Sequence, residues 1–419
     1  MRRLASSLGL IVAVVVSACG TSRGSPPPSA HAPSAHAAAR LPAGTSCGVP
    51  PAYVAAQTIP QTPDRSTTTI RPTWSALAAA ASGLGAAAAL EAIAISLDGG
   101  AIATAARVGD RASIQLWSAS GQPIATPGKI SIAAGTLLVA CLAWSPDGKT
   151  LAAGAVDGSV TEWSRAGSLL RTLPGTDPIE SLAWSPDGWL ATGAIHFPAA
   201  TATDPQTLPG VVRLWSADGT AIRTLGTDFT GGKFFNLGWS PDGSMLAAGV
   251  SDYHVWTADG AQVAIVRASG TPAWAMDWSP DGSSLAIGDE NGTADVLATS
   301  GASRGRRGFS AGVNFLAYSP DGSMLAVAMN SAVSVVRASD LGAVVWSDGV
   351  QSPQVRWAAD GHSLFVLGGR GLVEYSSDGR LLASLGGCDG NVTAFDLTAG
   401  SAVAVTDSGR ICAWAVAGS

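Results

Sequence analysis

The tetrapeptide Ser-Pro-Asp-Gly recurs along this chain, and its spacing limits the fold more than any other feature of the sequence. Intact copies begin at Ser145, Ser185, Ser240, Ser279 and Ser319, and degenerate copies begin at Ser96, Ala358 and Leu397. The closing glycines divide the chain into eight units of about 40 residues, two of them lengthened by insertions. Units of this length, repeated eight times, predict an all-β chain whose small sheets are arranged radially as the blades of a β-propeller.

The chemistry of a single unit supports this prediction. In the unit at residues 142–173, the Ser-Pro-Asp-Gly segment matches the four positions of a type I turn, where proline fixes φ at the second position and glycine accepts a positive φ at the fourth. Strands are expected up to Trp144, over residues 151–155 and 160–163, and around 169–173. Four short antiparallel strands of this kind make one blade.

Tryptophan placement provides an independent check on the repeat. One register lies directly before the turn and contains Trp144, Trp184, Trp239, Trp278 and Trp357, with Tyr318 in the same place. A second register ends the third strand and contains Trp117, Trp163, Trp215, Trp256 and Trp414, with Tyr375 in the same place. Large flat side chains repeated at fixed registers suit the packing between neighbouring blades, so we expect core positions and not a stacking surface for bases or sugars.

Over residues 88–419 these motifs resemble the WD40 repeat family, which implies a propeller of four-stranded blades. The chain departs from that family's pattern in two ways. The usual Gly-His is replaced by pairs such as Gly175-Thr176, and the usual Trp-Asp ending is replaced by pairs such as Trp117-Ser118. The hydrogen-bond network that uses that His and Asp is therefore expected to be absent. The Ser-Pro-Asp-Gly turn also occurs in TolB-type propellers, so the subfamily stays open.

The last unit shows how the ring is expected to close. It contains three strand-like segments and then ends, and in WD40-like propellers an N-terminal segment supplies the missing strand and removes the open edge. The candidates are residues 53–59 and residues 67–70. We therefore expect eight blades of four antiparallel strands, with the last blade closed by an N-terminal strand. Seven blades is the alternative, should the first unit be something else.

The N-terminus has the features of an export signal. Arg2-Arg3 supplies positive charge, and residues 8–16 form an apolar stretch that is too short to span a bilayer. Ser17-Ala18 directly before Cys19 resembles the bacterial lipobox, which implies that the signal peptide (residues 1–18) is cleaved and that Cys19 carries the lipid. Two or three acyl chains give stable anchoring. The segment could instead be an ordinary cleaved signal that happens to contain a cysteine.

The residues after Cys19 read as a flexible tether over residues 19–46, followed by the propeller over residues 47–419. The tether is rich in Pro, Ser and Ala and has almost no large apolar side chains, so it cannot offset its ordering entropy by burial. Gly20 follows the cysteine where an inner-membrane retention signal would place Asp. By resemblance to lipoproteins of two-membrane bacteria, the chain is expected to cross the inner membrane and to reside at the outer membrane or cell surface.

Four further cysteines lie in the exported part of the chain, where disulfides persist. A bond from Cys47 to Cys388 or Cys412 would fasten the closing strand to the last unit, and we favour Cys388 because it lies in a loop. Cys141 falls in an inner strand and is expected to be a buried thiol. Zinc is not expected, because the cysteines and histidines lack the required spacing.

No catalytic or cofactor motif emerges from the rest of the sequence. The nucleophile elbow, the Walker A loop, the zinc-protease helix and the dinucleotide fingerprint are all missing in suitable contexts. The repeated aspartates are explained by the turn motif, and His196, His254 and His362 fall in different units. A formal net charge of −6 and the lack of a basic stripe disfavour nucleic acid. We therefore expect no catalytic residue, cofactor or metal.

Two irregular segments provide a candidate binding face. Residues 195–210 form an insertion between the second and third strands of the third unit, and Lys233 enters the fourth unit after a glycine-rich loop. Connections of these two kinds lie on the same face of a propeller. We therefore group His196, Phe197, Lys233 and Phe235 as a candidate patch.

Together these features favour a lipid-anchored, non-catalytic scaffold that binds other proteins of the cell envelope. Propellers bind at their loops and central opening, which is an argument by analogy with the fold. Two alternatives stay open: a propeller enzyme, either a hydrolase or a redox protein, and a structural module. The latter would be similar in architecture to the propeller lipoprotein of the outer-membrane protein assembly machinery.

Overall fold

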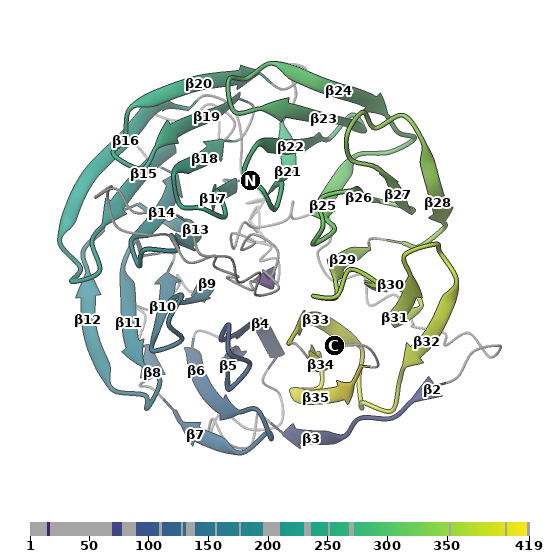
Figure 1. The fold of residues 1–419 in the computed structure, drawn as a ribbon. Helices are drawn as coiled ribbons and strands as arrows, with labels where there is room; N and C mark the ends of the chain where they lie inside the picture. Colours follow the sequence, from purple (N-terminus) through teal and green to yellow (C-terminus); the bar gives the residue numbers. More distant parts are fainter. Residues whose placement is uncertain are drawn as a thin grey trace, which may run out of the picture.

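The structure, a computed structural model, describes residues 15–16, 69–77, 89–108, 111–126, 129–130, 139–155, 157–175, 177–195, 210–229, 236–249, 252–267, 272–351, 353–398 and 400–416. In these ranges the chain contains strands and turns and no helix, hence no helix suited to crossing a membrane. Eight sheets, whose blade strands pair antiparallel, stand around a common centre (Figure 1). The prediction of eight four-stranded blades is thus confirmed, and the seven-bladed alternative is wrong.

Each blade runs outward in chain order from an inner strand that faces this centre. Blade 1 comprises β4 (Ala89–Ile95), β5 (Ala101–Val108) and β6 (Arg111–Ser118), with β7 (Pro123–Ala125) and β8 (Lys129–Ile130) both paired to β6. Blade 2 comprises β9 (Val139–Trp144), β10 (Thr150–Ala155), β11 (Val160–Ser164) and β12 (Leu169–Leu173). Blade 3 comprises β13 (Ile179–Trp184), β14 (Leu190–Ile195), β15 (Gly210–Trp215) and β16 (Ala221–Phe229). Blade 4 comprises β17 (Asn236–Trp239), β18 (Met245–Gly249), β19 (Asp252–Thr257) and β20 (Gln262–Arg267).

The second half of the ring repeats this order. Blade 5 comprises β21 (Ala273–Trp278), β22 (Ser284–Asp289), β23 (Thr293–Ala298) and β24 (Ser303–Gly308). Blade 6 comprises β25 (Val313–Tyr318), β26 (Met324–Met329), β27 (Val333–Arg337) and β28 (Val344–Asp348). Blade 7 comprises β29 (Gln354–Trp357), β30 (Ser363–Gly368), β31 (Gly371–Ser376) and β32 (Leu381–Leu385). Blade 8 contains β33 (Val392–Leu397), β34 (Ser401–Thr406) and β35 (Arg410–Ala415).

The ring closes through an N-terminal segment that contacts two blades. The strand β3 (Trp74–Leu77) pairs antiparallel with β35 and completes blade 8, with Ser75 opposite Cys412. Just before it, β2 (Thr69–Ile70) pairs in parallel with β32 and adds a fifth strand to blade 7. Figure 1 shows both strands along the outer rim. Closure by an N-terminal strand is therefore confirmed.

Neither predicted closing segment is the closing strand. Residues 67–70 overlap β2, which joins the neighbouring blade, and residues 53–59 lie outside the described residues. Pro72 separates β2 from β3, and proline within a strand interrupts its ladder of hydrogen bonds. Because of this break, the chain leaves blade 7 after Ile70. It joins blade 8 at Thr73, whose N–H donates to the Ala413 carbonyl over 2.6 Å, and the paired strand begins at Trp74.

At the inner edge of blade 1, the two-residue strand β1 (Val15–Val16) pairs in parallel with β4. It belongs to the segment that the sequence assigns to the signal peptide.

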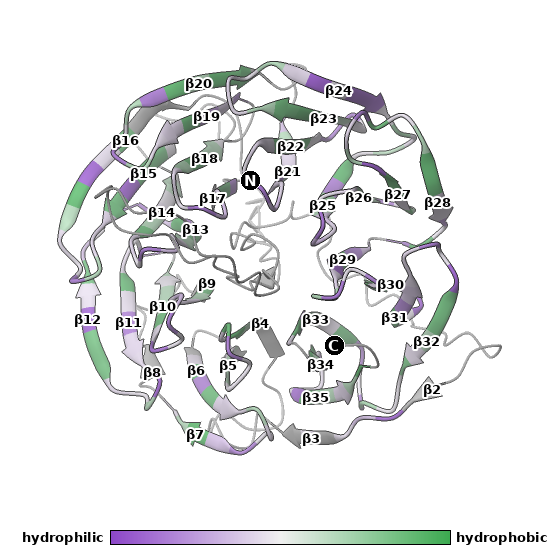
Figure 2. Cartoon of the chain, viewed as in Figure 1, coloured by the Kyte–Doolittle hydropathy of each residue, from purple (hydrophilic) through white to green (hydrophobic). Residues whose placement is uncertain are grey.

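The hydrophobic core lies between blades. Each apolar cluster joins the facing sides of two neighbouring sheets; one cluster, for example, combines Ala94 and Leu116 of blade 1 with Leu142, Trp144 and Trp163 of blade 2. The predicted tryptophan registers are confirmed as core, because all ten of these side chains are buried. In Figure 2, apolar residues run along the strands of the blades, whereas β24 stands out as a hydrophilic outer strand.

Candidate functional site

The two faces of the propeller carry different connections. Strands within a blade are antiparallel, so the turns after the first and third strands lie on one face. The turns after the second strands and the connections to the next blade lie on the other. We call the first the turn face, since it holds the Ser-Pro-Asp-Gly turns from residue 96 to residue 361. The second is the loop face, which includes the turn at residues 290–292.

On the turn face, the repeated aspartates complete the turns that contain them. In blade 2, Ser145 Oγ donates to Asp147 Oδ1 over 2.7 Å and accepts from the Thr150 N–H over 2.9 Å. The same carboxylate oxygen accepts from the N–H of Lys149 over 3.1 Å. Equivalent bonds form in the turns of blades 1, 4, 5 and 6. These bonds favour the ionised carboxylate, because N–H and O–H donors stabilise negative charge.

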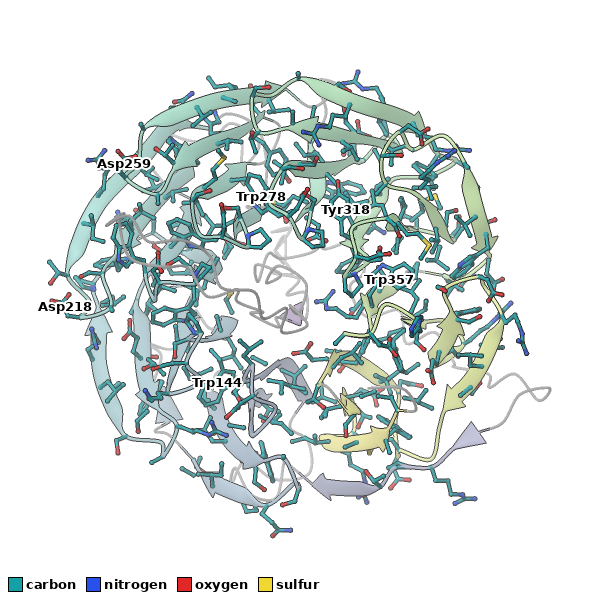
Figure 3. The ribbon with its side chains drawn as sticks, viewed as in Figure 1. Trp144, Asp218, Asp259, Trp278, Tyr318 and Trp357 are labelled. Carbon is teal, nitrogen blue, oxygen red and sulfur yellow. A yellow bond between two sulfur atoms is a disulfide. The ribbon has the colours of Figure 1, made fainter. Side chains whose placement is uncertain are left out.

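The pKa values of these aspartates reflect their bonds. Partial burial alone would raise the pKa of Asp98, but hydrogen bonds from Arg165, Ser96 and the Gly100 N–H outweigh burial and lower it to about 2. On a turn between third and fourth strands, the Ser216 hydroxyl and the Thr220 N–H likewise lower the pKa of Asp218 to about 2. Figure 3 places Asp218 and Asp259 at the outer edge of the ring.

Neighbouring turns also contact one another around the ring. A Cβ added at Gly282 would lie 3.6 Å from Asp242 Oδ1, and one at Gly148 would lie 3.6 Å from Asp98 Oδ1. The turns of blades 4 to 7 therefore pack against the proline or aspartate of the turn in the blade before. This packing and the turn hydrogen bonds explain the aspartates as structural residues, as the sequence predicted.

The predicted binding patch stays a prediction. His196, Phe197, Lys233 and Phe235 all lie outside the described residues. The strand ends that hold these two loops are described, and they lie side by side. Gly210 is opposite Ile195 in one pairing and opposite Phe229 in the next, so both loops leave blade 3 at the same face. The inference that the two connections share a face is confirmed.

The tryptophans before the turns bind the blades to each other. In five blades the indole Nε1–H donates to a backbone carbonyl of the preceding blade, as Trp184 does to Ala143 over 3.1 Å and Trp278 to Gly238 over 3.0 Å. Figure 3 shows Trp144, Trp278, Tyr318 and Trp357 on the inner side of their blades. An indole that is buried normally finds a hydrogen-bond acceptor, and here the acceptor is always across a blade boundary.

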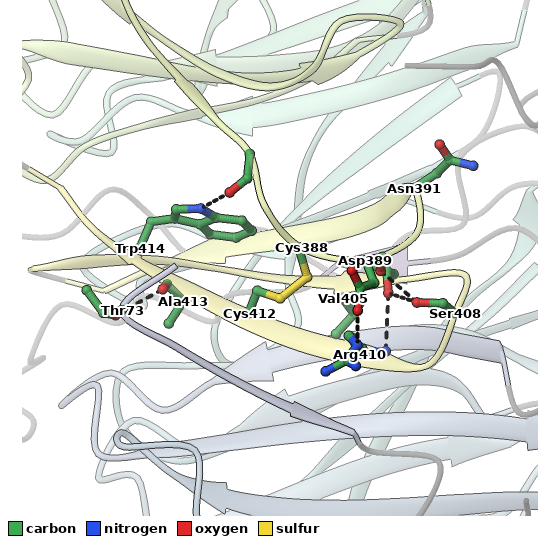
Figure 4. The surroundings of a disulfide bond; sticks show 12 residues. Thr73, Cys388, Asp389, Asn391, Val405, Ser408, Arg410, Cys412, Ala413 and Trp414 are labelled. Atoms are coloured by element: carbon green, nitrogen blue, oxygen red, sulfur yellow. Dashed lines mark hydrogen bonds and ion pairs between the residues drawn. A yellow bond between two sulfur atoms is a disulfide. The ribbon is translucent and has the colours of Figure 1, made fainter. Parts of the chain in front are cut away.

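The cysteines pair differently from the prediction. Cys388 is bonded to Cys412, with their Cα atoms 6.1 Å apart, so the expected bond from Cys47 to Cys388 is wrong (Figure 4). The connection from blade 7 to blade 8 passes beside β35, which brings Cys388 within reach of Cys412. Cys47 itself lies outside the described residues. Cys141 is fully buried as predicted, but it is disulfide-bonded and not a free thiol.

The bond lies within a small polar cluster at the ring closure. The Arg410 guanidinium pairs with the Asp389 carboxylate over 2.9 Å, and Ser408 Oγ donates to the Asp389 carbonyl over 2.6 Å. Figure 4 shows these contacts beside the disulfide. Because Cys412 lies opposite Ser75 of β3, the disulfide holds the strand on which the closing segment is paired.

Among the described residues, no three His, Cys, Asp or Glu side chains are arranged to hold a metal ion. His254 is buried and stacks on Trp256 at a ring distance of 5.6 Å, whereas His362 lies on a turn of blade 7. Burial raises the pKa of Glu180 on β13 to about 7. His254, His362 and Glu180 lie in separate blades, so these three groups do not form an acid–base set.

Three charged residues on the inner strands were not predicted as functional from the sequence, namely Asp277, Arg356 and Asp396. Each is the second-to-last residue of its strand, at a position that holds alanine or glycine in the other blades. Aligning the units shows that these three residues differ from the rest. Their role, however, depends on which side chain of the next blade packs against that position.

Comparisons with known proteins agree with this fold. Residues 131–164 match the family model described as WD domain, G-beta repeat. The solved C-terminal WD40 domain of Sif2 is similar at 15% identity and a TM-score of 0.64, covering 84% of this chain and 99% of that chain. Sqt1 of Saccharomyces cerevisiae is similar at 13% identity and a TM-score of 0.65, covering 84% of this chain and 100% of that chain.

A third solved structure is Sqt1 of Chaetomium thermophilum bound to the N-terminus of ribosomal protein L10. It is 18% identical with a TM-score of 0.62, and the match covers 79% of this chain and 98% of that chain. No curated protein sequence matches this chain. At these identities the similarity shows the fold alone, which is a β-propeller.

Proposed function

We propose that this WD40-like, eight-bladed propeller is a non-catalytic scaffold that binds other proteins through its loop face at the bacterial cell envelope. The observation that carries the proposal is the difference between the two faces. The serine and aspartate side chains of the turn face are used in holding the turns. The longest connection within the ring of blades, residues 196–209, leaves the loop face between Ile195 and Gly210, beside the connection that follows Phe229.

The loop face has the properties of a protein-binding surface. Loops held by rigid strands can vary without cost to the core, and for this reason binding residues concentrate on them. The described turns here expose Glu290, Asn291 and Ser331. A relative in fold, Chaetomium thermophilum Sqt1, binds a segment of another protein, which supports binding of the same kind by this chain.

Anchoring at the envelope rests on the N-terminal sequence. With Cys19 carrying lipid, the tether over residues 19–46 would separate the membrane from the ring. A stretch of this length spans at most about 100 Å when fully extended, at roughly 3.3–3.6 Å per residue. The propeller would then reach partners well above the lipid headgroups. We place it at the outer membrane or the cell surface.

The binding face can be tested by site-specific photocrosslinking in intact cells. A photoreactive residue at Glu290, Asn291 or Ser331 is expected to give discrete adducts with envelope proteins. The same residue at Lys149 or Asp187 is the matched control, because both are exposed on the turn face. Adducts only from the control positions would overturn the choice of face, and the absence of protein adducts at every position would overturn the scaffold proposal.

The anchor needs a separate experiment. Cys19→Ser is expected to abolish lipid labelling and to move the protein from the membrane to the soluble fraction. A variant that keeps its lipid label would refute Cys19 as the attachment site. Recovery of assembly-machinery components in the crosslinked adducts would instead assign the chain to that complex. A bound metal or cofactor in the purified protein would favour an enzyme.

A further inference from the structure

The eight blades differ at the second-to-last position of the inner strand. The last position of that strand, directly before the turn, is called the slot. We call the second-to-last position the socket, because the side chain from the next blade is placed over it. In blades 1 to 8 the socket residues are Ala94, Ala143, Ala183, Gly238, Asp277, Ala317, Arg356 and Asp396. Five sockets hold a very small residue, and three hold a charged one.

The small sockets all lie beneath a tryptophan of the next blade. The indoles of Trp144, Trp184, Trp239, Trp278 and Trp357 donate to the carbonyls of Ala94, Ala143, Ala183, Gly238 and Ala317, at 3.2, 3.1, 3.2, 3.0 and 3.0 Å. A Cβ added at Gly238 would lie 3.2 Å from Met276 Cε and 3.9 Å from Trp278 Cδ1. Side chains of the next blade, the indole among them, thus leave little space for a larger side chain at this socket.

The charged sockets all precede a blade that lacks this tryptophan. Blades 6, 8 and 1 carry Tyr318, Leu397 and Ile95 in the slot. In place of the indole bond, Asp277 reaches across to blade 6 and its Oδ2 accepts from the Tyr318 N–H over 2.7 Å. At the joint between blades 8 and 1, Asp396 is buried, and the N–H of Ile95 in blade 1 stabilises its ionised form. The direction of the bond is reversed, but the same two blades are joined.

The positive charge of Arg356 favours the ionised form of both aspartates. Arg356 occupies the socket of blade 7. The N–H groups of Tyr318 and Trp278 also favour the ionised form of Asp277, and those of Ile95 and Leu397 that of Asp396. Two buried carboxyl groups therefore depend on one guanidinium.

We propose that Asp277, Arg356 and Asp396 form a pH-sensitive clasp, which replaces the missing indole bonds and loosens when both aspartates are ionised. The joint between blades 8 and 1, where the ring closes, depends on it through Asp396. One guanidinium cannot compensate two buried negative charges, so loss of the second proton leaves the clasp with a net charge in a desolvated place.

The direction of the pH effect follows from the titration of the two groups. In the full-length chain, where β1 pairs with β4 and contacts β33, burial raises the pKa of Asp277 and of Asp396 to about 7, against the opposing effect of Arg356. The folded chain therefore holds protons that the unfolded chain releases between about pH 4 and pH 7. The stabilising contribution is complete below the ordinary pKa of 3.8 and is lost as the pH rises through about 7. The ring is expected to close more firmly in mildly acidic medium.

The exchange between the two kinds of joint can be tested with a double-mutant cycle. Asp277→Ala removes the bond to the Tyr318 N–H, and Tyr318→Trp places an indole over an occupied socket, so each single variant should unfold more readily than wild type. Together they recreate the pair found in the other blades. The double variant is expected to recover much of the loss. If the double variant loses as much free energy of unfolding as the two single variants together, the aspartate bond does not replace the indole bond and the proposal is wrong.

The pH dependence provides the second test. Each clasp aspartate should change the unfolding equilibrium constant about tenfold per pH unit in the window where only the folded state holds its proton. Asp396→Asn and the Asp277→Ala/Tyr318→Trp pair should each reduce this slope between pH 5 and pH 7. Asp321→Asn is the control, because the pKa of that exposed turn carboxyl is lowered and it does not titrate there. An unchanged slope in Asp396→Asn would refute the clasp.

A measurement on the unmodified protein covers the case in which a variant fails to fold. Carboxyl-carbon NMR of the wild-type chain, titrated from pH 4 to pH 9, is expected to show two aspartates that titrate near neutrality. If every aspartate titrates below pH 5, the clasp is wrong.

Discussion

Removal of the Cys388–Cys412 bond should weaken the closure of the ring by a calculable amount. The bond joins residues 24 apart in sequence, and the chain-entropy relation for a loop of that size gives about 3.4 kcal/mol at 25 °C. The double variant Cys388→Ser/Cys412→Ser should lose this stabilisation. For a propeller of about 350 residues, with an unfolding entropy near 2.1 cal/mol/K per residue, the loss corresponds to roughly 5 °C in Tm.

Denaturant unfolding under non-reducing conditions measures the loss without disturbing the bond at Cys141. The matched control is Ser408→Ala, which removes a hydrogen bond of the same cluster and should cost only about 0.5–1.5 kcal/mol. The double variant should also expose β3 and β35 to protease, because Cys412 lies opposite Ser75. A loss no larger than that of the control would refute the reasoning that this cross-link secures the closure.

Three further predictions concern packing, charge and closure. Gly288→Ala would bring a Cβ within 2.3 Å of Val313 Cγ1 in the next blade, so it should destabilise by about 1–3 kcal/mol in denaturant unfolding. Gly308→Ala meets nothing within 4 Å and should be close to neutral; equal losses would contradict the packing argument. Asp98→Asn should flatten the acid-unfolding curve, because the lowered pKa makes the wild-type contribution present above pH 4 and lost as the pH falls toward 2. An unchanged curve would argue against a role for its bonds with Ser96 and Arg165. Deletion of residues 1–77 should leave the edge of β35 unpaired and increase self-association in sedimentation, whereas deletion of residues 1–68 keeps β2 and β3 and should not. Equal behaviour of the two deletions would contradict closure by β3.

The parts of the fold that repeat were predictable from sequence. The turn motif and the two tryptophan registers recur in phase, so each unit reinforces the interpretation of the others, and they led to eight blades and to an interblade core. The closing strand does not repeat. Trp74–Leu77 is four residues long and follows a proline, and its strand character comes from pairing with β35 and not from its own pattern.

For the cysteines and the candidate site, prediction from the sequence was limited because the sequence does not show which distant segments lie side by side. Sequence spacing shows that Cys388 lies in a loop, but not that this loop passes beside the strand containing Cys412. The same limit applies to Asp277. Its role in joining two blades can be recognised only when Tyr318 is known to lie opposite it across the blade boundary. The loops that hold His196 and Lys233 were predicted to share a face, and their anchoring strand ends do share it.

A crystal structure of the mature chain would show whether the ring is closed and has eight blades. We expect eight sheets, with β3 paired to β35 and β4 packed against β33 across the closing joint. A ring of seven sheets with residues 89–130 outside it, or an open ring with a free edge at β35, would refute this fold.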